Sequence, residues 1–370
     1  MKAPLTQRDL ARQAGVSQAT VCLALRGDPR ISKPVRDKIQ SIAAAAGYRQ
    51  NPLLSAYQAV VRSRKPLTYR ATIGWLVDHP ERDLWRNQSW LSPYFSAAEN
   101  RAKDLGYALD EIWFPGIAKG PTRENIETLL KILRTRSIHA LILPFLHNYR
   151  FALHKWAEIS IVVIGRPMGF IQNRSERYTT NLNEYHEVNA DAYYNLNLAL
   201  ENLYRRNYRR IGLLMSDWLI ASTDHIYEAA YLGFLDRHPD LPRLSRCPGH
   251  EPGSAVLSPT MIRDWIQREQ PDAIVCSHGK TRDVLASIGV RVPEDVGLCH
   301  LHLSADVAGW SGIDHNPQAI ASAAVDLLTA NIQRNEFGMP ESPKEVLIKG
   351  RWVSGATTRD ELKLEEGTRA

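Results

Sequence analysis

The sequence predicts two parts of different fold class: a small all-α head and a larger α/β body with parallel sheets. Residues 1–66 hold 12 Lys and Arg against 3 Asp, a net charge of +9, whereas the remaining 304 residues sum to −3. Short apolar runs that alternate with amphipathic helices begin only at Ala71. The length of 370 residues also exceeds the roughly 250–300 residues at which a single core stops growing. We therefore expect more than one domain.

The head, residues 1–48, is predicted to contain three short helices. Thr6 can cap the first, with Asp9 three residues on, and Gly15 ends it. Ser17 can cap the second, and a third runs from about Ser32 to Gly47. Two short helices around a glycine turn, packed on a third, form a helix-turn-helix, in which the second helix enters the DNA major groove. The positive charge of the segment favours this interpretation over a helix bundle that does not bind DNA.

These residues resemble a known family. Residues 5–21, LTQRDLARQAGVSQATV, are similar to the start of lactose/galactose repressor (LacI/GalR) family regulators, and the likeness continues at 31–32, 36–39 and 46–51. It implies that the second helix reads bases with Gln18, Ala19 and Leu23. A glutamine can bond to an adenine edge at two points, whereas Ala and Leu offer only apolar contacts. Many members carry Arg where Leu23 stands, so we expect an operator that differs from the common family palindrome.

Phosphate contacts and a hinge complete the expected DNA interface. Phosphates are contacted by polar and basic side chains that orient the head without specifying sequence; the candidates are Thr6, Ser17, Thr20, Arg26, Arg30 and Arg36. The resemblance makes residues 49–70 a hinge helix and linker, starting near Asn51, that inserts an apolar side chain into the minor groove. Tyr57 stands at the usual wedge position, and Leu53 or Leu54 are alternatives. A linker helix that only packs on its dimer mate remains a further alternative.

The body, residues 71–356, reads as two α/β halves. The first half contains strand patterns at 72–77, 107–114, 140–144 and 159–164, with helices at 96–105 and 123–134. The second half repeats the scheme with 189–203, 210–215, 229–238, 261–269, 273–276 and 296–303, followed by a helix at 319–332 that returns the chain to the first half. Alternation of this kind predicts parallel sheets with helices on both faces. We expect lobe 1 to comprise about 71–167 and 304–336, and lobe 2 about 168–303 and 337–356.

The resemblance extends over nearly the whole chain and implies a two-lobed periplasmic-binding-protein-like domain. Matching pieces stand at 105–107, 209–214, 292–296 and 350–357. The implied function is a regulator, expected to be a repressor, whose affinity for a double-stranded DNA operator is controlled by a small molecule between the lobes, expected to be a sugar or sugar derivative. The alternative is a constitutive DNA-binding regulator with a non-functional cleft.

The expected effector site departs from the family pattern. Ala230 stands where many sugar-binding members carry Arg, and Ser277 and His278 replace the usual Asn-Asp. The turn after the strand at 296–301 reads HLSAD instead of an Asp-rich turn. Because parallel strands place ligands at their carboxyl ends, we select these candidate cleft residues from strand ends: Asn148, Asp191, Trp218, Ser277, His278, His302 and Asp306.

Other protein classes are disfavoured. No nucleotide-binding glycine loop, nucleophile elbow or zinc-protease motif is present, so we expect no enzyme and no cofactor. His300-x-His302 could face one side of a strand, but without a Cys or acidic partner we expect no metal site. The four scattered cysteines fit reduced thiols, and the start of the chain lacks a secretory signal, so a cytoplasmic protein without a membrane segment is expected. The charged tail, 357–370, has no heptads, so we expect a homodimer rather than a coiled-coil tetramer.

Overall fold

The structure is a computed structural model. It describes residues 7–25, 30–45, 71–79, 81–115, 122–145, 158–165, 185–251, 254 and 256–361. The predicted hinge helix and linker, residues 49–70, and the last nine residues of the tail lie outside this set. Within the described part of the chain, no helix combines the length and apolar character that crossing a bilayer requires.

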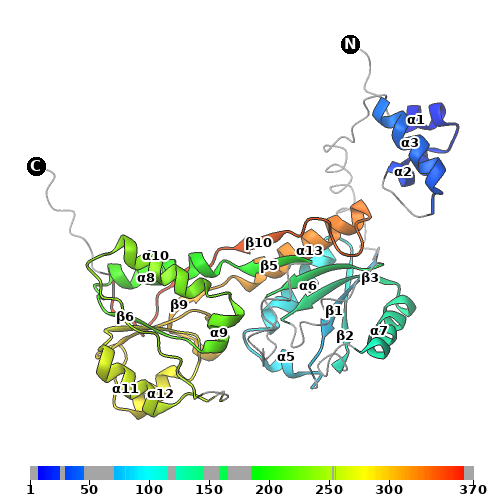
Figure 1. Ribbon diagram of the computed structural model, residues 1–370. Coiled ribbons are helices and arrows are strands. Elements are labelled where there is room, and N and C mark those ends of the chain that lie inside the picture. The colour runs from blue at the N-terminus through cyan, green and yellow to red at the C-terminus, as the bar shows by residue number, and fades with distance from the viewer. Residues whose placement is uncertain are drawn as a thin grey trace, which may run out of the picture.

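The head contains the three predicted helices (Figure 1): α1 (Gln7–Ala14), α2 (Gln18–Leu25) and α3 (Lys33–Ala45). Each contributes a fully buried apolar side chain to one small core, namely Leu10, Val21 and Ile39. Gly15 between α1 and α2 adopts φ +72°, a left-handed conformation that glycine reaches without steric cost. The sequence prediction of a helix-turn-helix with a packing third helix is therefore confirmed.

The first sheet of the body has the strand order β10-β5-β4-β3-β1-β2, with all neighbours parallel. The strands are β1 (Thr72–Val77), β2 (Ala108–Trp113), β3 (Ile138–Pro144), β4 (Ser160–Ile164), β5 (His186–Ala190) and β10 (Glu345–Ile348). Side chains of successive residues in β1 point to opposite faces of the sheet. On one face Trp75 packs with α6 (Ser92–Asp104) and α13 (Pro317–Arg334), and on the other Leu76 packs with α7 (Arg123–Thr135). Both faces are thus covered, as a parallel sheet requires.

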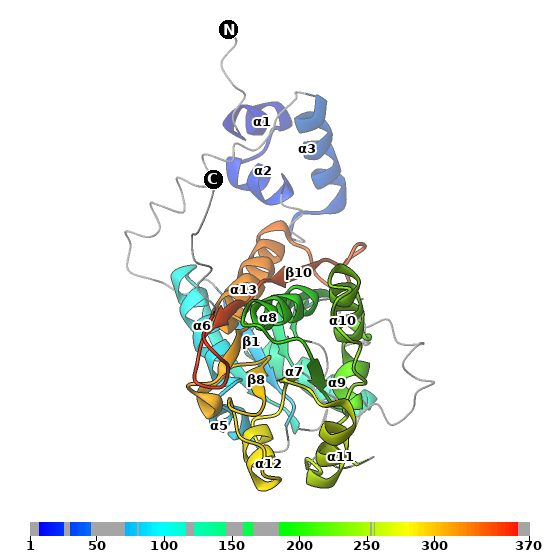
Figure 2. The same ribbon diagram turned by 90° about the vertical axis from the view of Figure 1, so that its left-hand side faces the viewer.

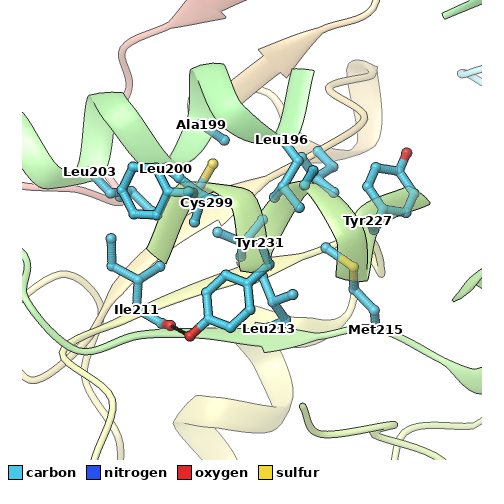
Figure 3. Close-up of a cluster of buried hydrophobic side chains, with 14 of the residues drawn as sticks. Leu196, Ala199, Leu200, Leu203, Ile211, Leu213, Met215, Tyr227, Tyr231 and Cys299 are labelled. Carbon is cyan, nitrogen blue, oxygen red and sulfur yellow. Dashed lines mark hydrogen bonds between the residues drawn. The ribbon is translucent and has the colours of Figure 1, made fainter. Parts of the chain in front are cut away.

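The second sheet has the order β11-β9-β8-β7-β6. Its strands are parallel except for β11, the last strand along the chain, which pairs with β9 in antiparallel orientation. The strands are β6 (Ile211–Leu214), β7 (Ala273–Cys276), β8 (Gly297–His300), β9 (Ser311–Asp314) and β11 (Arg351–Val353). One face is covered by α8 (Ala192–Arg205), α9 (Asp217–Ser222) and α10 (Ile226–Arg237), and the other by α11 (Pro259–Glu269) and α12 (Thr281–Ser287). Figure 3 shows the first of these cores, in which the buried Tyr231 hydroxyl donates to the Ile211 carbonyl at 2.8 Å.

Each sheet with its helices forms one lobe. The two lobes lie side by side in Figure 1, and in Figure 2 the second lobe lies in front of the first. The sheet order corrects the predicted division at three places. Strands β5 and β10 belong to the first sheet, although 186–190 and 345–348 were assigned to lobe 2, and β9 belongs to the second sheet, although 311–314 was assigned to lobe 1. Residues 189–203, expected as one element, divide into β5 and α8, because Asp191 caps a helix start by accepting from Tyr194 N–H at 2.8 Å.

Three chain crossings connect the lobes within the described residues: β5 to α8, β9 to α13, and β10 to β11. The crossings lie side by side. Asp191 N–H donates to the Ile348 carbonyl at 2.9 Å, and the Gly350 N–H donates to Asn195 Oδ1 at 2.8 Å. The Arg351 guanidinium pairs with Asp314 at 2.8 Å. We call this group of crossings the hinge.

The cysteines of the body are free thiols, as expected. Cys247, Cys276 and Cys299 are all buried and unpaired by disulfides. Burial raises the pKa of Cys276 to about 12 and that of Cys247 to about 11. Since the thiolate is the reactive form, these side chains behave as small apolar groups of the core.

Candidate functional site

The start of α2 is positioned by a hydrogen-bonded cap. The Ser17 hydroxyl accepts from Thr20 N–H at 3.1 Å and lies 2.8 Å from the Thr20 hydroxyl. The buried Val21 and Ala24 fix the inner face of the helix in the head core. Gln18 is exposed at the first turn, and Leu23 is half-buried one turn further on. The first turn of α2 therefore exposes a polar side chain, that of Gln18, which could contact the edges of bases in a DNA groove.

The predicted phosphate contacts fall into three groups. Ser17 and Arg30 are exposed, and Thr20 is half-buried beside the cap. Arg36 is half-buried at the start of α3, and its guanidinium donates to the Ile31 carbonyl at 3.1 Å, so part of its donor capacity holds the preceding turn. The side chain of Ala19 is outside the described set, and the remaining DNA candidates also lie outside it: Thr6, Arg26, Asn51, Leu53, Leu54 and Tyr57.

In the body, the carboxyl ends of both sheets carry aromatic and imidazole side chains. On the first lobe, Trp90 and Tyr94 pack edge-on against Phe145, with ring centroids 5.2 and 5.0 Å away. Tyr94 belongs to α6, and Phe145 directly follows β3. Aromatic faces of this kind pack against flat apolar surfaces, including the faces of sugar rings.

On the second lobe, His302 follows β8, and its ring lies 4.0 Å from that of His315, which follows β9. The Tyr227 hydroxyl of α10 is 3.5 Å from His302 Nε2. Figure 3 shows Tyr227 at the edge of the core, with its hydroxyl directed away from the other side chains drawn. His300 lies beside this group, because the His302 N–H donates to His300 Nδ1 at 3.1 Å.

That hydrogen bond fixes the tautomer of His300. Since Nδ1 accepts, the neutral ring carries its proton on Nε2. His300 Nε2 is buried and has no hydrogen-bond partner among the described residues, and neither has His315 Nε2. An unpaired buried donor or acceptor costs about 1–3 kcal/mol. These two nitrogens are therefore available to a polar ligand atom.

The imidazoles are held neutral. Burial, then the nearby His302, lowers the pKa of His300 to about 3. Burial, then His300, lowers the pKa of His315 to about 4, and the pKa of His302 is lowered by burial and by His315. Three rings this close cannot all carry a proton in a site of low polarity.

A hydrogen bond joins the lobes near this site: Ser89 of the first lobe donates to Asp306 Oδ2 of the second at 2.5 Å. Tyr94 of the first lobe is buried, and its pKa is raised by that burial and by the charges of Asp314 and Tyr227 of the second lobe. The aromatic residues of one lobe and the imidazoles of the other therefore lie towards one junction. We call this junction the interlobe cleft.

The predicted effector residues are only partly brought together. Three of them lie near His300 at the ends of β7 and β8, namely Ser277, His278 and His302. His302 and His278 lower the pKa of His300, and a hydrogen bond with the Ser277 backbone raises it. Asp306 is exposed and joins the lobes, whereas Asp191 caps α8 in the hinge and Trp218 packs against the core. Asn148 lies outside the described residues. Sequence reasoning did not select these further residues of the cleft: Ser89, Trp90, Tyr94, Phe145, Tyr227, His300 and His315.

A signal for part of this set was present in the sequence. His302 was selected as a candidate cleft residue, whereas His300 was considered with it only as a possible metal pair. In the described residues, no three His, Cys, Asp or Glu side chains form a group that could hold a metal ion. The His302 ring instead packs at a tilted angle against that of His315, and the His300 ring packs edge-on against Trp310 at a centroid distance of 5.7 Å.

The comparisons with known proteins agree with this architecture. Residues 6–51 match the sequence model of the bacterial regulatory proteins, lacI family. No curated protein matches the chain. The structure is similar to a transcriptional regulator CelR-cellobiose complex, with 15% identity, 95% of this chain and 99% of that chain covered, and a TM-score of 0.57.

Two further solved structures share the fold. A lac repressor dimer bound to operator and the anti-inducer ONPF has 16% identity and a TM-score of 0.53, with 97% of this chain and 100% of that chain covered. A periplasmic binding protein/LacI transcriptional regulator from Alkaliphilus metalliredigens QYMF, complexed with D-xylulofuranose, has 18% identity and a TM-score of 0.52, with 78% of this chain and 99% of that chain covered.

A helix-turn-helix head that precedes a two-lobed periplasmic-binding-protein-like body defines a DNA-binding transcription regulator. The match over residues 6–51 includes α2 and its cap. The head therefore belongs to the lacI family of bacterial regulatory proteins, and the body shares the fold of the solved structures.

Proposed function

We propose that this regulator is a homodimeric repressor that binds a two-fold DNA operator and is controlled by a sugar or sugar derivative in the interlobe cleft. The observation that carries the proposal is the junction at the carboxyl ends of both sheets, where aromatic side chains of one lobe and imidazoles of the other lie near the Ser89–Asp306 hydrogen bond. Ligands of open parallel sheets bind at such ends. The two solved neighbours named with cellobiose and D-xylulofuranose support a sugar as the ligand class.

A two-fold dimer supports the DNA side of the proposal. It would place two copies of α2 on half-sites about one helical turn apart. A ligand that stabilises the closed lobes would alter the hinge, and so the fraction of dimers able to bind DNA. Light scattering of the full chain tests the dimer.

The Gln18→Ala variant tests the proposed base contact. Gln18 is exposed at the first turn of α2, and losing a bidentate contact costs about 1–3 kcal/mol of discrimination. We expect binding to the best operator, selected from random DNA fragments by the wild-type protein, to weaken about 5- to 150-fold, with relaxed preference at one base pair of each half-site. The matched control is Gln13→Ala, an exposed glutamine on α1, which should stay within about threefold. Equal affinities of the two variants would reject Gln18 as a reading residue.

Thermal unfolding with added sugars tests the cleft. A ligand present at 100 times its Kd stabilises the folded chain by about 2.7 kcal/mol, so cellobiose, xylulose and related sugars are screened for a rise in Tm. The Tyr94→Phe variant removes a hydroxyl at the meeting of the lobes and should reduce the rise, whereas Tyr107→Phe, in the core of the same lobe, should not. If no sugar raises Tm while operator binding is intact, the chain is a constitutive DNA binder with a non-functional cleft.

A further inference from the structure

One half-buried leucine of α2 lies outside the described core of the head. At about 100° per residue, Leu23 lies about 160° around the helix from Val21, which is fully buried in that core. Leu23 belongs neither to the core nor to the described side chains that pack against it, whereas the half-buried Leu25 does pack against it. The fold of the head therefore does not use the exposed part of the Leu23 side chain.

The helix that carries Leu23 has no charged residue, since its sequence is QATVCLAL. The basic residues of the head lie on the neighbouring segments instead, among them the exposed Arg12 of α1, Arg30 before α3 and Lys33 at the start of α3. Phosphate contacts from such flanking residues supply affinity without sequence information. An uncharged helix between basic segments fits a ligand that is anionic at its edges and has an apolar group between them.

The major groove of DNA has that chemistry. Phosphates line both edges of the groove, and the apolar group that a base presents there is the C5-methyl group of thymine. The other groups of the base edges are hydrogen-bond donors and acceptors, which a leucine cannot pair. Leu23 follows the exposed Gln18 by five residues, a rise of about 7.5 Å along the helix, so the two side chains can address different base pairs.

We infer that Leu23 reads thymine through its methyl group, so that each operator half-site must carry a methyl-bearing pyrimidine at one fixed position. The inference rests on the proposed function and deepens it, because it names the chemical group that the operator must present. It also separates two sources of binding. Contacts with phosphates weaken as the salt concentration rises, whereas a contact between two apolar groups is not screened by salt.

Deoxyuridine tests the methyl group itself. The full chain first selects its best operator from random DNA fragments, and each thymine of that operator is then replaced in both half-sites by deoxyuridine, which lacks only the methyl group. At one position, binding should weaken about fourfold for each half-site, the effect of exposing about one buried methylene group. This loss should be the same at low and at high salt. If no deoxyuridine weakens binding, the inference is overturned without any variant of the protein.

A methylated cytosine returns the methyl group on a different base pair. At the same operator position, 5-methylcytosine paired with guanine should bind about fourfold better, for each half-site, than unmodified cytosine paired with guanine. Equal binding of the two would show that the thymine is recognised through DNA shape or through another group of the base pair, and would reject the methyl contact.

Variants of the protein identify the residue that reads the methyl group. Leu23→Ala should bind the thymine and deoxyuridine operators equally, and Leu23→Met, which keeps an apolar side chain of similar volume, should retain the preference. The control Gln13→Ala changes an exposed residue of α1 and should discriminate as the wild type does. A Leu23→Ala protein that retains the full preference would assign methyl reading to another residue and reject Leu23.

The outcomes separate this inference from the proposed function. If the chain selects no DNA fragment, operator binding fails and methyl reading fails with it. If an operator is selected and bound tightly but is indifferent to its methyl groups, the proposed function stands and only the inference about Leu23 fails.

Discussion

Replacing Gly312 by alanine should unfold the second lobe or lower its stability by about 4 kcal/mol or more. Gly312 pairs with His300 in the centre of the second sheet. A Cβ added there would lie 2.0 Å from the His300 carbonyl oxygen and 2.9 Å from its carbonyl carbon. Both atoms are backbone in a buried strand, so neither can move without breaking the pairing of β8 with β9. Thermal unfolding should show a fall in Tm of more than about 10 °C.

The matched control for this change is Gly279→Ala. A Cβ at Gly279 would meet only Val307 Cγ1, at an ordinary contact distance of 3.6 Å. We expect its Tm to stay within about 2 °C of the wild type. A Gly312→Ala protein as stable as this control would show that the strand can shift to admit a methyl group, and that the close approach is not a requirement of the fold.

Replacing Leu10 by aspartate should abolish operator binding while leaving the body folded. Leu10 is fully buried in the core of the head, together with Val21 and Ile39. A carboxylate there costs several kcal/mol, and so small a domain has little stability to lose. Operator affinity should fall at least about 100-fold, which corresponds to about 2.7 kcal/mol. The thermal transition of the body should be unchanged, because its cores contain no residue of the head.

The control separates burial from charge. Gln13→Asp adds the same negative charge to the same helix at an exposed position. Repulsion of DNA phosphates alone should weaken binding by no more than about tenfold. If the two aspartates weakened binding equally, the loss would come from charge, and the three-helix core would not be required for DNA recognition.

The elements that sequence predicted well are those with strong local signals. The capping residue Ser17 and the turn residue Gly15 predicted the start of α2. The apolar run 72–77 predicted both ends of β1 correctly. The elements that it missed are short or formed by distant pairing. Strand β11 has three residues and is held by pairing with β9, and β10 is held by pairing with β5 about 160 positions away. No local pattern can reveal a partner that far along the chain, so β5 and β10 were assigned to the wrong lobe, whereas β11 was assigned to the right one.

On the DNA side, candidate residues were predicted from their positions in the second helix of the head. On the ligand side, candidates were predicted only because they directly follow strands. Ser277, His278 and His302 were reached because they follow β7 and β8. Tyr94 and Tyr227 lie on helices, where nothing in a single sequence distinguishes a cleft residue from a core residue. His300, His302 and His315 come together because β8 and β9 pair in parallel, which brings the residues at and after the ends of both strands to one edge of the sheet. The roles of all these residues remain predictions until the variants are measured.

The pairing of β5 with β10 also has a consequence for synthesis of the protein. Between these two strands the chain builds nearly the whole second lobe, and only afterwards does β10 cover the outer side of β5. Until residue 345 has left the ribosome, β5 is an edge with free backbone groups, and exposed edges of this kind invite pairing with other chains. A truncated or stalled chain that ends before β10 should therefore aggregate through the first lobe, even though every other strand of that sheet has already been made.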